Sequence, residues 1–316
     1  MLAVALAAQP TACMTGKATM QKNAQDYIAG FQRGEDFHPP AEGIIVSGQP
    51  DPVALQILGN ELAVGSPSVR ENIVALLVDV GRRTDPLTPR GADVLRHPQI
   101  LALLAGPGFA KADLGREAAA DALRKLATAR DLARFEDALV KALEDGPTDD
   151  IFLLVAKAKP SKAAQLVNRL AATPKWKDVE SAKIARAALG AKDIENQFLN
   201  QTTQAEGAAD GKALGTALGS LALIGTPESL KAVAERLRTP LTISIPGAME
   251  KSVRVNVLEA LLYNFPDEPV LYPNNINDDA GYAAAERFCT ATLGVAYTTP
   301  RPSYLKYRAF PTAGPQ

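Results

Sequence analysis

Cysteine and histidine are scarce in this chain, which has two of each among 316 residues. Two cysteines, Cys13 and Cys289, cannot build a disulfide framework. The two histidines, His38 and His97, each stand beside a proline, and neither is paired with an adjacent glutamate. A four-ligand zinc site or a serine–histidine–aspartate triad has too few residues to draw on. We therefore expect no metal site, no cofactor and no catalytic residues, and a protein that is not an enzyme.

Net charge and long apolar runs are lacking as well. The formal charge is −1 at pH 7, which argues against a general nucleic-acid binder. No run of about 18 apolar residues occurs, so no ordinary transmembrane helix is expected. Aromatic residues make up only 5% of the chain although 47% is apolar, because alanine and leucine supply most of the apolar matter. Such small residues are typical of closely packed helices, and we expect protein partners rather than nucleic acid.

Residues 1–19 are expected to form a leader. The apolar stretch from Leu2 to Ala8 resembles part of a signal peptide, and the residues around Cys13 resemble the end of a bacterial lipobox. Two features oppose this interpretation: no lysine or arginine precedes the stretch, and Pro10 stands where a lipobox has an aliphatic residue. Export, lipidation of Cys13 and an unprocessed cytoplasmic leader all stay open. A periplasmic or envelope-associated location is favoured, with membrane contact only through lipidation.

One pattern occurs twice in the chain. Residues 160–170 and 227–237 both begin with proline and end with Arg-Leu, and each meets another proline shortly afterwards, at Pro174 and Pro240. From Pro52 onward, apolar residues recur at steps of three and four, which predicts helices almost throughout. One of these helices is expected to begin at Ser66-Pro67 and to stop at Gly81. A repeated helical unit predicts a stacked array of helical hairpins.

Three short segments carry a resemblance to a known family: Ser-Val-Arg at 68–70, Ala-Arg-Ala-Ala-Leu-Gly at 185–190 and Ala-Leu-Ile-Gly-Thr-Pro-Glu at 222–228. With these segments the chain resembles the HEAT-repeat, armadillo-like α-solenoid proteins. The resemblance implies an all-α fold over residues 20–297, a right-handed α-solenoid of about five or six helical hairpins. The spacing of the units is irregular, so a tetratricopeptide array or a non-repeating helical bundle remains an alternative.

Residues 298–316 form a proline-rich tail in which basic and aromatic residues alternate. This tail either caps the end of the array or contacts a partner, since exposed aromatic residues need cover. Its candidate contact residues are Arg301, Tyr304, Lys306, Tyr307, Arg308 and Phe310.

Three further patterns have an ordinary structural interpretation. Asn275, Asn277, Asp279 and Glu286 have the spacing of a calcium loop, but Ala280 replaces the glycine of its turn, and a helix cap is the preferred interpretation. The glycines at 211, 215 and 219 are expected where helices approach closely. Trp176, between two lysines, is expected to anchor a loop between helices rather than to bind nucleic acid.

We therefore expect a non-catalytic scaffold or accessory subunit of a larger assembly, one associated with the bacterial envelope. The alternative is an enzyme built on the groove of a helical array, such as a HEAT-like lyase or chromophore-attachment factor. That alternative predicts a deep groove lined by carboxylates or tyrosines, for example Tyr263 or Tyr272. A lipid-anchored structural protein is a third hypothesis, and it predicts acylation of Cys13.

Overall fold

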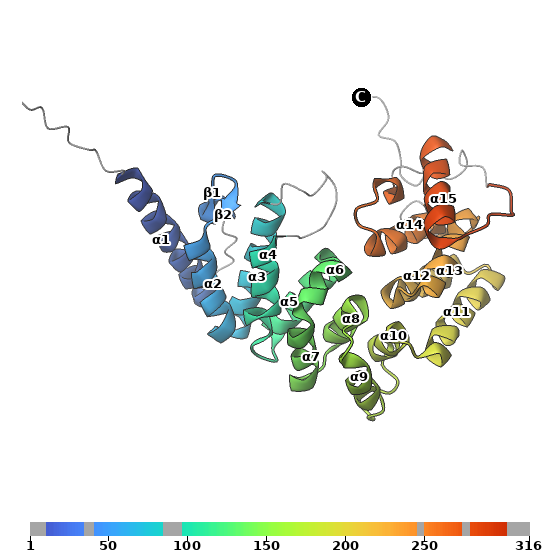
Figure 1. Ribbon diagram of the computed structural model, residues 1–316, viewed down its shortest axis with the longest axis horizontal. Coiled ribbons are helices and arrows are strands. Elements are labelled where there is room, and N and C mark those ends of the chain that lie inside the picture. Colours follow the sequence, from blue (N-terminus) through green and yellow to red (C-terminus); the bar gives the residue numbers. More distant parts are fainter. Residues whose placement is uncertain (1–10, 35–40, 85–96, 245–249, 274–278, 302–316) are drawn as a thin grey trace, which may run out of the picture. The chain divides into compact units, whose positions relative to one another are not determined.

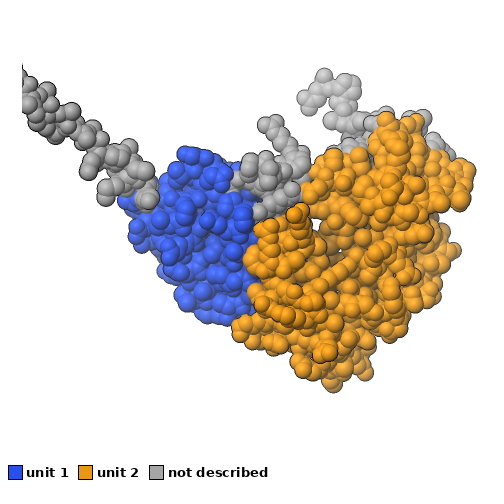
Figure 2. Space-filling model, in the orientation of Figure 1, with its two compact units in different colours: residues 1–127 blue, residues 128–316 orange. Residues whose placement is uncertain are grey.

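The computed structural model describes residues 11–34, 41–84, 97–244, 250–273 and 279–301, with the backbone alone for 11–17. The described part of the chain is all-α apart from two short antiparallel ribbons. It divides into two compact units, residues 1–127 and residues 128–316 (Figure 2). The all-α class expected from the sequence is therefore confirmed.

Within the described residues, the first unit consists of helices and one two-stranded ribbon (Figure 1). Its elements are α1 (Thr11–Arg33), η1 (Ala41–Ile44), β1 (Ile45–Val46), β2 (Gln49–Pro50), α2 (Pro52–Val64), α3 (Pro67–Thr84), α4 (Pro98–Ala105), η2 (Pro107–Phe109) and α5 (Leu114–Leu126). Helix α1 packs against α2 and α3, and α3 packs against α5. Apolar residues of α2, α3 and α4 meet in the core of this unit.

A buried arginine ties three parts of the first unit together. Arg70, in the first turn of α3, has no exposed surface. Its guanidinium donates to the Leu62 carbonyl at 2.6 Å and to the Gly108 carbonyl at 2.8 Å, and it pairs with the carboxylate of Asp113. Because Asp113 also caps α5, this arginine fixes the starts of two helices at once. Its donors satisfy carbonyls that burial would otherwise leave without a partner.

In the part of the second unit that the structure describes, all regular elements are helices except one two-stranded ribbon. Its elements are α6 (Ala129–Leu132), η3 (Ala133–Phe135), α7 (Glu136–Asp145), α8 (Asp149–Ala158), α9 (Ala163–Ala171), α10 (Glu180–Ala188), α11 (Lys192–Gly207), α12 (Gly211–Ile224), α13 (Pro227–Glu235), η4 (Arg236–Arg238), β3 (Thr242–Ile243), β4 (Lys251–Ser252), α14 (Val253–Asn264), η5 (Pro269–Leu271) and α15 (Asp279–Leu293). Alternate helices α8, α10, α12 and α14 each pack against the next (Figure 1). Helices α9, α11 and α13 pack against this row.

Hydroxyl–carboxylate hydrogen bonds link helices that are two apart in the second unit. Ser181 of α10 donates to Asp149 of α8. Ser220 of α12 donates to Glu180 of α10 at 2.8 Å. Ser229 of α13 donates to Glu195 of α11 at 2.8 Å. A small hydroxyl residue lets neighbouring helices approach, and its bond to a charged acceptor is stronger than one to a neutral acceptor.

The two similar segments of the sequence form equivalent helices, α9 and α13 with η4. The same three positions are buried in both, namely Ala163, Leu166 and Val167 in the first segment and Leu230, Val233 and Ala234 in the second. The two starts differ. Thr226 caps α13, with Pro227 in its first turn, whereas α9 begins three residues after Pro160 because Lys159 still belongs to the end of α8.

Helix α1 begins at Thr11, inside the segment expected to be a leader. The expected end of α3 at Gly81 is wrong. Helix α3 continues past Gly81 to Thr84, and its last turn carries an ion pair one helical turn apart, between Arg83 and Asp79 at 2.9 Å. Such a pair supports a helix end, and the basic side chain suits the negative end of the helix dipole.

The glycines of α12 were expected where helices approach closely. Two of the three are sites of close approach, but the nearest neighbour is β3, and helix α14 comes second at 3.4 Å. A Cβ added to Gly211 would lie 2.0 Å from the Thr242 carbonyl oxygen, and one added to Gly215 would lie 3.1 Å from the Ile243 side chain. Thr242 and Ile243 form β3, which pairs with β4. Gly219 has nothing within 4 Å of such an atom, so close packing does not explain it.

Candidate functional site

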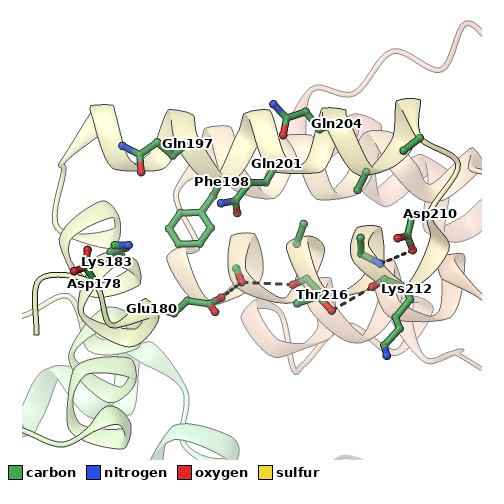
Figure 3. A pocket seen from close by; sticks show the side chains of 15 residues that line it. Asp178, Glu180, Lys183, Gln197, Phe198, Gln201, Gln204, Asp210, Lys212 and Thr216 are labelled. Carbon is green, nitrogen blue, oxygen red and sulfur yellow. Dashed lines mark hydrogen bonds between the residues drawn. The ribbon is translucent and has the colours of Figure 1, made fainter.

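A groove of about 790 Å³ lies in the second unit between α11 and α12, and the start of α10 borders one end (Figure 3). This volume falls within the range of small-molecule and peptide sites. The groove is bordered by two helices that run side by side, so its walls are rigid elements rather than loops. Its lining combines carboxamide, small and charged side chains.

One wall of the groove carries three glutamines of α11. Gln197, Gln201 and Gln204 are spaced by four and three residues and line the groove together, as this spacing places them on one face of a helix. All three are exposed, and none of their side chains makes a hydrogen bond within the described residues. The ten residues from Asn196 to Ala205 contain no charged side chain. This wall therefore offers hydrogen-bond donors and acceptors without net charge.

The opposite wall belongs to α12 and is made of small side chains. Ala213, Thr216, Ala217 and Ser220 line it, again at helical spacing. Phe198 points from α11 toward this wall and is 5% exposed, so it forms the apolar floor (Figure 3). Because the wall is small and the floor is buried, space remains beside the glutamine amides for an extended chain.

Charged residues stand at the two ends of the groove. At one end, Glu180 accepts the Ser220 hydrogen bond through Oε1, and Asp178 and Lys183 stand beside it (Figure 3). At the other end, Asp210 caps α12 by accepting from the Ala213 amide at 2.9 Å. Each of these two carboxylates thus accepts through one oxygen, and the second oxygen of each has no bond within the described residues.

The tail residues predicted to contact a partner fall mostly outside the described residues: Tyr304, Lys306, Tyr307, Arg308 and Phe310. Arg301 is described, and it contacts its own chain. Its guanidinium pairs with Glu286 of α15 and lies 5.0 Å from the centre of the Tyr282 ring. Glu286 also accepts from Arg238 at 2.7 Å. The first residue of the predicted contact set therefore fastens the chain against α15.

The Glu286 contacts also bear on the candidate calcium loop. Burial on its own would raise the pKa of this carboxyl, but hydrogen bonds from Arg238 and Arg301 outweigh it and hold the pKa below its ordinary value. The carboxylate is thus already neutralised by two arginines and lies within α15. Residues 275 and 277 of the same pattern fall outside the described residues. Within the described part, no three His, Cys, Asp or Glu side chains gather where a metal ion could sit.

The other residues singled out in the sequence lie outside the groove between α11 and α12. Trp176 lies in the turn between α9 and α10, is 8% exposed, and meets Phe152 edge-on with ring centres 5.0 Å apart, as expected for a loop anchor. Tyr263 lies under the Lys157 ammonium, which is 4.0 Å from its ring centre. Neither Tyr263 nor Tyr272 lines the groove. Cys13 lies in α1, where only the backbone is described, so its lipidation stays a prediction.

The groove residues were not predicted from the sequence. The available signal was the uncharged stretch from Asn196 to Ala205, in a chain of which 22% is charged. That stretch alone does not show which face of the helix borders another helix.

Over the described residues, no helix combines the length and apolar character that a membrane crossing needs. Comparison of the chain with protein-family models, with curated proteins and with solved structures gave no match.

Proposed function

We propose that this chain is a non-catalytic protein-binding scaffold that holds an extended polypeptide segment in the groove between α11 and α12. The observation that carries the proposal is the row formed by Gln197, Gln201 and Gln204. A carboxamide donates and accepts at once, as a peptide unit does. Three such groups on one helix face are suited to the backbone of a segment that has left its own secondary structure.

The proposal includes the architecture. The row of alternate helices α8, α10, α12 and α14 supports a HEAT-like right-handed solenoid, because each helical hairpin in such an array covers the next. In this arrangement a groove between helices is a natural docking place for a partner. We further propose that the scaffold serves as an accessory subunit of a larger assembly associated with the bacterial envelope, following the apolar leader and its Cys13.

The competing function, a HEAT-like lyase or chromophore-attachment factor, needs reactive side chains that converge in the groove. Three carboxylates line it: Asp210 caps a helix, Glu180 accepts from Ser220, and Asp178 stands beside Glu180 at one end. The side chains that face each other across the groove are amides and small residues. This chemistry favours binding over catalysis.

Peptide selection tests the proposed binding site. A phage library of random dodecapeptides is selected against the full chain, and the affinity of the selected peptides is measured by fluorescence polarisation. The variant in which Gln197, Gln201 and Gln204 are all replaced by alanine loses three hydrogen bonds of about 0.5–1.5 kcal/mol each. We expect affinity to fall by roughly 10- to 1000-fold. Exposed alanines favour a helix, so the fold is retained.

The matched control replaces Asn196 and Asn200, which are exposed on the same helix but do not line the groove. Its affinity should equal that of the unchanged chain. Equal losses in both variants, or no loss in the glutamine variant, would contradict the proposed site.

The proposed envelope location has a separate test. Mass spectrometry of the native N-terminus that finds Met1 intact would exclude both export and lipidation of Cys13.

We also propose that the tail, residues 298–316, contacts a partner. Truncation after Arg301 tests this proposal and keeps the ion pair between Arg301 and Glu286. Proteins that copurify with the full chain and with the truncated chain are compared. Loss of partners on truncation is the expected result, because residues 302–316 contain the remaining predicted contact residues. An unchanged set of partners would show that the tail does not contact them.

A further inference from the structure

Lys159 adopts a backbone conformation that its residue type disfavours. It follows the last residue of α8 and has φ 49° and ψ 51°, in the left-handed region. Glycine is the usual residue at such a helix end, and a side chain there costs about 1 kcal/mol. At the equivalent end of α12 the chain has glycine, Gly225, with φ 58°. A lysine in place of glycine at the end of α8 therefore requires an explanation, and the contacts of its side chain supply one.

The side chain of Lys159 reaches into a cleft where three helices end. Its Nζ donates to the carbonyl oxygen of Gly225 at 2.5 Å, and the cleft also borders Asn264 at the end of α14. The cleft has a volume of about 240 Å³, and its lining shares no residue with the groove between α11 and α12. Apart from the two lysines and Asn264, the residues that line it are apolar or glycine, and Leu223, Leu230 and Phe265 are among them.

The surroundings of the amine favour its neutral form. Burial of the ammonium lowers the pKa of Lys159, and the negative charge of Glu195 opposes this only in part. Lys157, the other lysine of the cleft, is held over the ring of Tyr263 at 4.0 Å. Lys159 nevertheless counts among the exposed residues, so the cleft is open to solvent. An amine whose pKa is lowered and that borders an apolar cleft has the surroundings in which lysine acts as a nucleophile.

We propose that Lys159 is a reactive amine that binds a small carbonyl compound, an aldehyde or ketone, in this cleft. The nitrogen lone pair attacks the carbonyl carbon and forms a carbinolamine. Loss of water then gives the imine, with the carbonyl oxygen and both amine protons leaving as that water. No oxidant or reductant enters the step, and hydrolysis reverses it. The cleft volume suits a short aliphatic chain among its apolar side chains.

A purely structural role makes a different prediction. Lys159 also contacts the C-terminal end of α12 through the Gly225 carbonyl, and cations stabilise such ends. If that were its whole role, the cleft would hold no carbonyl compound, and the amine would react no faster than an exposed lysine. The reactivity of the site therefore separates the two roles.

The test uses the full chain with propionaldehyde and cyanoborohydride at pH 7, which traps imines as propyl-lysine. Peptide mass mapping then gives the rate at each lysine. We expect Lys159 to react at least about threefold faster than the exposed Lys177, because more of its amine is neutral. A rate no higher than that of Lys177 would overturn the proposal.

A second variant tests the cleft itself. Ala158→Leu adds bulk to the cleft lining and keeps the amine. The rate at Lys159 should fall to that of Lys177, while the circular dichroism spectrum stays unchanged. If the rate in this variant stays as high as in the unchanged chain, the cleft does not hold the carbonyl compound and the proposal fails.

Discussion

Replacing Glu195 with alanine removes a buried carboxylate that joins α11 to the start of α13. Its side chain has no exposed surface. One oxygen accepts from the Ser229 hydroxyl at 2.8 Å and from the Thr226 hydroxyl, and the other accepts from the Lys192 ammonium at 2.7 Å. Thr226 is also the cap of α13. The substitution therefore affects both the contact between two helices and the cap of one of them.

The magnitude follows from the burial of each partner. The Lys192 side chain is 61% exposed, so water solvates its ammonium once Glu195 is removed. The ion pair between the two residues therefore contributes little to the free energy of unfolding. Ser229 has no exposed surface, and its hydroxyl bond to a charged acceptor is worth about 1.5–3 kcal/mol. Thr226 is half-buried and partly regains water. Together with the loss of buried methylene groups, the expected loss of stability is about 3 kcal/mol.

Fluorescence of Trp176 is the appropriate assay. It is the only tryptophan of the chain, and it is buried within the second unit, the unit that contains Glu195. Its emission in a urea titration therefore follows the unfolding of that unit alone. The urea midpoint and the slope of the transition give the free energy of unfolding.

Glu228→Ala is the matched control. Glu228 bonds the same Lys192 ammonium at 3.0 Å, but its side chain is 55% exposed. Its removal should change the free energy of unfolding by less than about 0.5 kcal/mol. A loss below about 1 kcal/mol for Glu195→Ala, or equal losses in the two variants, would refute the reasoning that burial decides the strength of these bonds.

Three further predictions concern the second unit. Gly211→Ala places a methyl group against the Thr242 carbonyl and should cost about 1–3 kcal/mol in the urea titration, whereas Gly219→Ala in the same helix should stabilise by up to about 1 kcal/mol; equal effects would contradict the close approach. Burial raises the pKa of Cys289 to about 11, so its thiol should resist a thiol reagent at pH 8 until urea unfolds the chain, as peptide mapping would show. Burial would raise the pKa of Glu195, but its three hydrogen bonds lower it overall. The unfolded chain therefore takes up the proton first, and stability should fall as the pH drops below the ordinary glutamate value of about 4.3; Glu195→Gln should reduce this dependence, of which Glu286 supplies another part, and an unchanged pH profile would contradict it.

Much of the secondary structure follows from local signals in the sequence. Ser66-Pro67 marks the start of α3 and Gly225 the end of α12, because capping and backbone preference act within a few residues. The apolar spacing of the two similar segments predicts which faces of α9 and α13 are buried. The all-α class follows from the same periodicity, since it repeats along most of the chain.

Contacts between distant segments were decided only by the tertiary structure. Gly211 and Gly219 look alike in the sequence, but β3 passes close to Gly211 alone. The groove likewise depends on which face of α11 turns toward α12, and the cleft depends on three helices that end at one place. Sequence periodicity defines the buried face of each helix, whereas the partner of that face is set by packing between residues far apart in the chain.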